Sequence, residues 1–335
     1  MKTYHKLWLA LTLMLFCSTV LLAQQGGSHT QTDSLLKQGV ALNDAGKFAD
    51  AIAKYDEVLK TDPNNITAMY EKGFSLSAAG KNDEAILCFE KVIASRQMPN
   101  AYVALANIYD NRSDFARAEK YYQQGIATFP NYGSLWYNLG LSYIRQKKYT
   151  QAEAAATESI KINPKHVASY QVYGYATYFQ GKNAMALMGI ANFLMFNPPP
   201  QQARVGAMLV RQILNGAPNS GTDPLAKTQQ ETIAKAVALA TAGKTDLKTA
   251  DSVSLQLTSS FKAIKEQSGR YNSPFFDRYF GDFFGAMAGS NYMDVFTHVI
   301  TVSLAPQENI MWLKSHADDA KAFNVWLSTQ KRLTE

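Results

Sequence analysis

Apolar residues recur along most of the chain at every third or fourth position, which is the spacing of one face of an α-helix. The pattern repeats in blocks of about 34 residues, and each block divides into two helices of about fourteen residues. Two columns of small residues mark the blocks: Gly39, Gly73, Ala106, Gly140 and Gly174 in the first helices, and Ala51, Ala85, Ala118, Ala152 and Ala186 in the second. We expect these columns to face each other, because only small side chains let two helix backbones approach closely.

Residues that turn or stop a helix stand at fixed places in the blocks. Glycines at the expected turn between the two helices can adopt a left-handed backbone without steric cost: Gly46, Gly80 and Gly181. Prolines, which cannot continue a helix, close four blocks: Pro63, Pro130, Pro164 and Pro198. The pattern therefore predicts five helix pairs, over residues 32–65, 66–98, 99–132, 133–166 and 167–200.

These blocks resemble tetratricopeptide repeats. The fourth block carries the fullest form of the motif, with Trp136, Leu139, Gly140, Tyr143, Ala152 and Pro164 in register. The departures are Gln97 in place of a proline, Asn82 and Asn183 in place of the aromatic residue after the turn, and Thr177 in place of a tyrosine. The resemblance covers residues 32–200 and implies an all-α fold, a right-handed α-solenoid of stacked helix pairs.

The resemblance also implies where a partner would bind. Members of this family mostly bind peptides or protein segments along the concave wall formed by the first helices, and they rarely act as enzymes. Positions on that wall that packing does not require are Tyr70, Phe74, Asn107, Tyr137, Leu141, Arg145, Tyr175 and Tyr178. We expect these residues to contact a protein or peptide partner, because tyrosine offers a broad apolar face together with a hydroxyl.

Two alternatives bear on this wall. The C-terminal helices could fold into the groove and bury the same rings, and the sequence leaves this open. A subtype of the family holds a C-terminal carboxylate with two asparagines and several basic residues, and Asn107 and Asn138 match its asparagines. Its basic positions are occupied by Val103, Ala168 and Val172, so a bound carboxylate would lose its hydration without gaining a cation. We do not expect a carboxylate clamp.

Residues 201–335 lack a clear repeat but keep helical spacing. Predicted helices cover residues 201–215, 225–241, 246–267, 306–316 and 318–333, with two more between residues 274 and 300 and a loop at 216–224. The densest aromatic run follows Ser273–Pro274, a favourable helix start. Its rings are expected in a core that covers the last repeat, since a repeat array needs its terminal apolar face buried.

The N-terminus has the layout of an export signal. Lys2 and Lys6 form a positive start, residues 7–22 are almost wholly apolar, and Ala23 offers a cleavage position. An uncleaved anchor is the alternative, but the apolar stretch is short for a membrane span. The predicted organisation is a signal peptide over residues 1–23 and a flexible tail over residues 24–31. The protein is therefore expected to be exported, periplasmic or secreted, without a transmembrane segment after cleavage.

Charge and composition exclude several functions. The formal charge is only +6, two of these charges lie in the predicted signal peptide, and no basic block follows, so nucleic-acid binding is not expected. No metal-binding spacing and no phosphate-binding loop occurs, and no cofactor is predicted. The remaining candidates for chemistry are Asp277, Asp282, Asp294 and His298. We expect solvated carboxylates and a core-edge histidine, and hence an exported, non-enzymatic scaffold. The alternatives are a ligand-binding or catalytic C-terminal half and a self-closed structural protein of the envelope.

Overall fold

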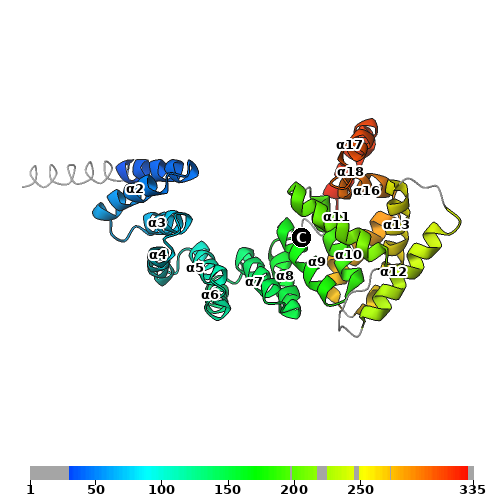
Figure 1. The fold of residues 1–335 in the computed structure, drawn as a ribbon, viewed down its shortest axis with the longest axis horizontal. Coiled ribbons are helices and arrows are strands. Elements are labelled where there is room, and N and C mark those ends of the chain that lie inside the picture. The colour runs from blue at the N-terminus through cyan, green and yellow to red at the C-terminus, as the bar shows by residue number, and fades with distance from the viewer. Residues whose placement is uncertain (1–29, 197, 217–224, 245–248, 272, 331–335) are drawn as a thin grey trace, which may run out of the picture. The chain divides into compact units, whose positions relative to one another are not determined.

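The computed structural model describes residues 30–196, 198–216, 225–244, 249–271 and 273–330 (Figure 1). The predicted signal peptide, most of the predicted tail and most of the predicted loop at 216–224 lie outside these ranges. Every regular element in the described part is a helix, so the all-α prediction is confirmed. The chain forms two compact units, Met1–Thr128 and Phe129–Glu335, which are described separately below.

The N-terminal unit contains three helix pairs in its described part. Residues 30–44 form the first helix. The others are α2 (Phe48–Thr61), α3 (Ile66–Ala78), α4 (Asn82–Ala94), α5 (Pro99–Asn111) and α6 (Phe115–Thr128). The predicted turn glycines Gly46 and Gly80 have φ angles of 73° and 78°. The same turn in the third pair is made by Ser113, at φ 60°, so a left-handed residue is needed there even without glycine.

The small residues of the first helices make room for rings from the second helices. A Cβ atom on Gly39 would lie 2.5 Å from the ring of Tyr55, and one on Gly73 would lie 2.9 Å from the ring of Phe89. These rings stand one turn after Ala51 and Ala85, the alanines that we expected to face the glycines. At Gly39 and Gly73 the close approach therefore admits an aromatic side chain, whereas Gly140 lies beside Ala152 and Ala155, as expected for two facing columns of small residues.

The C-terminal unit begins with two further helix pairs, α7 (Gly133–Arg145) with α8 (Tyr149–Ile162), and α9 (Val167–Phe179) with α10 (Asn183–Met195). Its other helices are α11 (Pro200–Leu214), α12 (Ala226–Thr241), α13 (Thr249–Gln267), η1 (Ser268–Tyr271), α14 (Pro274–Phe276), the π-helical turn η2 (Asp277–Gly281), α15 (Asp282–Ala288), α16 (Met293–Ile300), α17 (Pro306–Ser315) and α18 (Ala317–Ser328). These positions agree closely with the helices predicted from spacing.

Helix α10 lies at the centre of this unit. All 13 of its residues are buried, and it packs against α9, α11, α12 and α16 (Figure 1). Most buried apolar residues of the unit form one core that extends from Ala156 in α8 to Phe323 in α18. The C-terminal helices therefore share a core with α9 and α10, and the predicted boundary at residue 200 does not separate two compact bodies.

The aromatic run forms a nearly continuous helical segment. The Ser273 side chain accepts a hydrogen bond from the Phe276 backbone N–H, as expected for an N-cap, and Pro274 occupies the first turn. The ring of Phe280 lies 5.1 Å from that of Tyr173, in a stacked arrangement, and 5.8 Å from that of Tyr170, edge to face. These rings therefore cover the last helix pair, α9 with α10, at Tyr170 and Tyr173, as predicted.

Candidate functional site

In the N-terminal unit, the predicted partner-binding residues differ in their availability. Phe74 on α3 is 46% exposed, although it is large and apolar. Tyr70, one turn earlier, is half-buried and its ring lies 5.8 Å from that of Phe89. Asn107 on α5 accepts a hydrogen bond from the Tyr122 hydroxyl, so its side chain has a structural role. Phe74 is therefore the most accessible apolar member of this set.

In the C-terminal unit, four of the predicted residues are partly covered. Tyr137, Leu141, Tyr175 and Tyr178 are half-buried and pack against the core, while Arg145 is exposed. Burial raises the pKa of the Tyr137 and Tyr175 hydroxyls, and Gln171 donates a hydrogen bond of 3.3 Å to the Tyr175 hydroxyl. These side chains are thus neither fully open to a partner nor fully buried.

The C-terminal aromatic run covers a different part of α9 from the one that would close the groove. Phe275 and Phe280 contact Tyr173, and Phe280 also contacts Tyr170. Both tyrosines occupy packing positions of the repeat, not the predicted wall. These contacts do not involve the wall residues, so the alternative in which the C-terminal helices fill the groove stays open.

His166 supports Tyr137 from the loop that precedes α9. The two rings lie 4.8 Å apart, edge to face, and the His166 Nδ1 atom lies 2.7 Å from the Ser169 hydroxyl. Burial lowers the pKa of His166 below its ordinary value of 6.5, because the charged imidazolium loses hydration. Folding therefore favours the neutral form of this imidazole.

We expect this histidine to make the C-terminal unit less stable in mild acid. With a pKa lower in the folded than in the unfolded state, the unfolded chain binds the proton first as the pH falls below 6.5. The free energy of unfolding should then decrease between that pH and the lowered folded pKa. In urea titrations followed by tryptophan fluorescence at several pH values, His166→Gln should flatten this slope. An unchanged slope would contradict the prediction.

The candidates for chemistry in the C-terminal half do not form a common site. His298 is buried, its Nδ1 atom lies 2.6 Å from the Asn309 side-chain oxygen, and its ring stacks on Trp312. Asp282 is exposed and pairs with Lys265. Asp294 accepts a hydrogen bond from Ser254. These three groups each have a partner of their own. The fourth candidate, Asp277, is half-buried, and one of its carboxylate oxygens is buried without a hydrogen-bond partner among the described residues, which differs from the expected solvated carboxylate.

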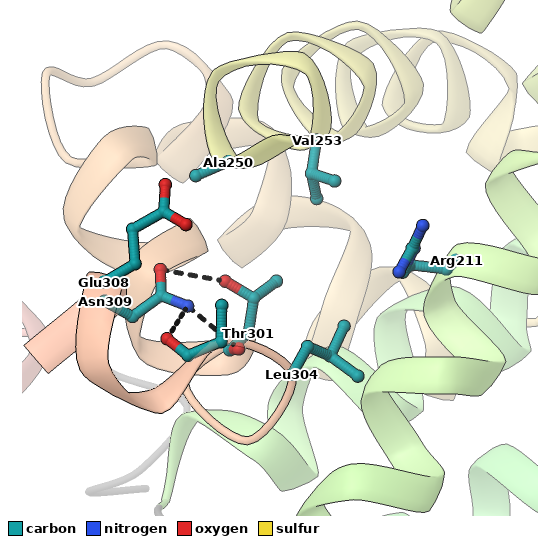
Figure 2. A pocket seen from close by; sticks show the side chains of 8 residues that line it. Arg211, Ala250, Val253, Thr301, Leu304, Glu308 and Asn309 are labelled. Atoms are coloured by element: carbon teal, nitrogen blue, oxygen red, sulfur yellow. Dashed lines mark hydrogen bonds between the residues drawn. The ribbon is translucent and has the colours of Figure 1, made fainter. Parts of the chain in front are cut away.

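Asn309 also borders a small cavity, which Figure 2 shows. The cavity measures about 30 Å³, and its lining comes from α11, α13 and the segment from Thr301 to Asn309. The Asn309 amide donates to the backbone oxygens of Thr301 and Ala305, at 3.1 and 3.0 Å. The cavity is close to the volume of one water molecule, so it is too small for an organic ligand.

Sequence reasoning missed two carboxylates in the N-terminal unit. Glu71 on α3 is half-buried, and its pKa is raised first by burial and then by the charge of Asp44. Folding thus brings two like charges near each other, although they are far apart along the chain. Glu71 stands three residues before Phe74 on the same helix face, which is a signal that could have added it to the predicted set.

Two kinds of feature are absent from the described residues. No group of histidine, cysteine, aspartate and glutamate side chains there has the arrangement of a metal site. No helix of the described part combines the length and apolarity required to cross a membrane.

Comparison with protein families and known proteins gives matches that cover most of the repeat region and extend into the C-terminal helices. The family described as "Cilia and flagella-associated protein 70 middle TPR-like domain" matches residues 102–266, and a tetratricopeptide repeat family matches residues 42–108. The general transcriptional corepressor trfA of Dictyostelium discoideum is 28% identical over 130 residues, which are 38% of this chain and 9% of that protein. The ER membrane protein complex subunit 2-A of Xenopus laevis is 27% identical over 43% of this chain and 44% of its own.

The chain thus spans less than half the length of these relatives. Among solved structures, MamA is 27% identical, with a TM-score of 0.42 over 47% of this chain and 92% of its own. Pseudomonas aeruginosa PilF is 16% identical, with a TM-score of 0.49 over 55% of this chain and 85% of its own.

Proposed function

Because the chain is a tetratricopeptide repeat protein, we propose that it is an exported, non-enzymatic scaffold that binds a protein or peptide partner through the first helices of its repeats. The N-terminal pattern of a positive start, an apolar stretch and Ala23 supports export. The separate partners of His298, Asp282 and Asp294 support a non-catalytic role for the C-terminal half.

The exposure of Phe74 is the observation that carries the proposed binding function. A phenylalanine side chain that remains 46% exposed leaves apolar surface in water, which a partner could bury with a gain in free energy. The residue stands on a first helix at a position that the repeat does not need for packing. Tyr137 and Tyr175 could contribute a similar surface, but they also support the core of their unit.

A capture experiment tests this function. The chain from Gln24 onward is immobilised, exposed to envelope proteins of its own cells, and the retained proteins are identified by mass spectrometry. We expect one or more proteins to be retained by the wild type and their retention to fall at least about tenfold with Phe74→Ala, because aromatic residues often dominate binding energy.

Leu87→Ala provides the matched control. Leu87 is 62% exposed but stands on α4, a second helix, so its truncation removes exposed apolar surface from a face not proposed to bind. Circular dichroism should show the same helicity for both variants. Equal retention by Phe74→Ala and the wild type, or no retention above that of bare resin, would refute the proposed function.

A further inference from the structure

The first helix pair holds a buried tyrosine hydroxyl between its two helices. Tyr55 comes from the second helix, α2, and its side chain is fully buried. Its ring passes against Gly39, where a Cβ atom would lie only 2.6 Å from Cζ, the carbon that bears the hydroxyl. Gly39 thereby lets the ring of Tyr55 lie directly against the backbone of the first helix.

The third helix pair shows how such a hydroxyl is normally satisfied. Tyr122 occupies the position in α6 that Tyr55 occupies in α2, and its hydroxyl donates to Asn107 on the first helix of its pair. Val40 stands where Asn107 would be expected in the first pair. Valine offers no acceptor, and no described residue gives the Tyr55 hydroxyl a hydrogen bond of good geometry. The acceptor beside it is the Ser75 oxygen, whose own proton is donated to Asn43 at 2.8 Å.

Two carboxylates are close enough to this hydroxyl to raise its pKa. The hydrogen bond between Ser75 and Asn43 fixes the end of the helix at 30–44 against α3. Asp44 follows Asn43, and Glu71 stands one turn before Ser75, so both charges lie at this junction. Their charges also act on Tyr55, whose pKa is raised to about 12 by burial, then by Glu71 and Asp44.

Neither carboxylate has a cation as partner in the described part of the chain. Lys72, the residue after Glu71, is paired with Asp56 at 2.6 Å. Two like charges beside a buried hydroxyl destabilise each other unless a cation joins them. Phe74 lies one turn after Glu71 and offers an exposed aromatic face, to which a cation or its apolar stem is also attracted.

We propose that Asp44, Glu71 and Phe74 form a receptor for a lysine or arginine side chain of the bound partner. This inference rests on the proposed function and specifies the chemistry of the partner, a basic segment with an apolar residue beside the cation. The two carboxylates accept hydrogen bonds from the cation, and Phe74 covers its stem. Binding fixes the Glu71 carboxylate near the Tyr55 hydroxyl and relieves the repulsion from Asp44.

Fluorescence anisotropy with defined peptides tests the receptor. One labelled peptide alternates leucine and lysine, and the other is identical except that every lysine is acetylated, which removes the charge but keeps the stem. The wild-type chain from Gln24 onward should bind the acetylated peptide at least about tenfold more weakly. Glu71→Gln and Asp44→Asn should each weaken binding of the lysine peptide about fivefold. Neither variant should lower the unfolding temperature, because each removes repulsion.

Asp50→Asn is the control, since Asp50 is an exposed carboxylate in the first turn of α2. It should bind both peptides like the wild type. Equal affinity for the two peptides, equal effects of all three variants, or no binding would overturn the receptor. Calcium binding that Glu71→Gln abolishes, without discrimination between the peptides, would replace it by a metal site. If the captured envelope protein is lost with Phe74→Ala but retained by Glu71→Gln and Asp44→Asn, the scaffold function stands and the cation receptor does not.

Discussion

Phe280→Ala is expected to lower the free energy of unfolding of the C-terminal unit by about 3–5 kcal/mol, because it opens a cavity that the surrounding rings cannot close. Phe280 is fully buried, and its ring contacts those of Tyr170, Tyr173, Phe275 and Phe276. Loss of this ring removes the contacts with Tyr170 and Tyr173 and leaves Phe275 against Tyr173. The expected result is therefore a C-terminal unit that unfolds at much lower urea concentration.

Tryptophan fluorescence can report this unit selectively. The chain has four tryptophans: Trp8 in the predicted signal peptide, and Trp136, Trp312 and Trp326 in the C-terminal unit. Phe179→Ala is the matched control, because Phe179 is 46% exposed and its truncation leaves no closed cavity. It should cost no more than about 1 kcal/mol. A Phe280→Ala variant as stable as the control would show that α9 does not depend on the aromatic run.

Gly174→Ala is expected to destabilise the same unit by about 1–3 kcal/mol, whereas Gly140→Ala in the equivalent position should be neutral or slightly stabilising. An added Cβ atom at Gly174 would lie 2.5 Å from Ile190 Cδ1 and 3.1 Å from the Ile190 backbone nitrogen, so the two helices would have to separate. At Gly140 the nearest atom is Val172 Cγ1 at 3.1 Å, and the next atoms lie at 3.6 Å.

The difference between the two glycines separates packing from helix propensity. Alanine favours a helix over glycine by up to about 1 kcal/mol, and this gain is the same for both positions. Only the room beside each backbone differs. Urea titrations of the two variants, followed by tryptophan fluorescence, give the comparison directly. Equal destabilisation by both substitutions would mean that the repeat requires glycine itself and not the space beside it.

Much of the fold could be predicted from the sequence, because short-range rules determine it. Helix spacing, turn glycines and the Ser273–Pro274 start are all local signals, and the helices observed follow them. The left-handed turn at Lys147, with φ 58°, and the π-helical turn at Asp277–Gly281 carry no such signal. The division after Thr128 was also not predictable, since it depends on which helices bury a common core.

The candidate site was less predictable, for a related reason. The face of a helix follows from spacing, but the availability of a side chain on it depends on neighbours that are distant in sequence. Asn107, which we expect to contact a partner, also accepts a hydrogen bond from Tyr122, and helix spacing does not reveal this bond. Asp44 and Glu71 were missed because a turn and an entire helix separate them along the chain.

The complete burial of α10 has a consequence for biosynthesis. The ribosome makes α10 about a hundred residues before α16, one of the helices that cover it. At a synthesis rate of roughly 5–20 residues per second, the apolar surface of α10 stays uncovered on that side for on the order of ten seconds. The helix pairs of the N-terminal unit have their partners within a few tens of residues and can close as they emerge. The nascent chain is therefore most prone to aggregation, and most dependent on chaperones, in the interval between the synthesis of α10 and the synthesis of the C-terminal helices that cover it.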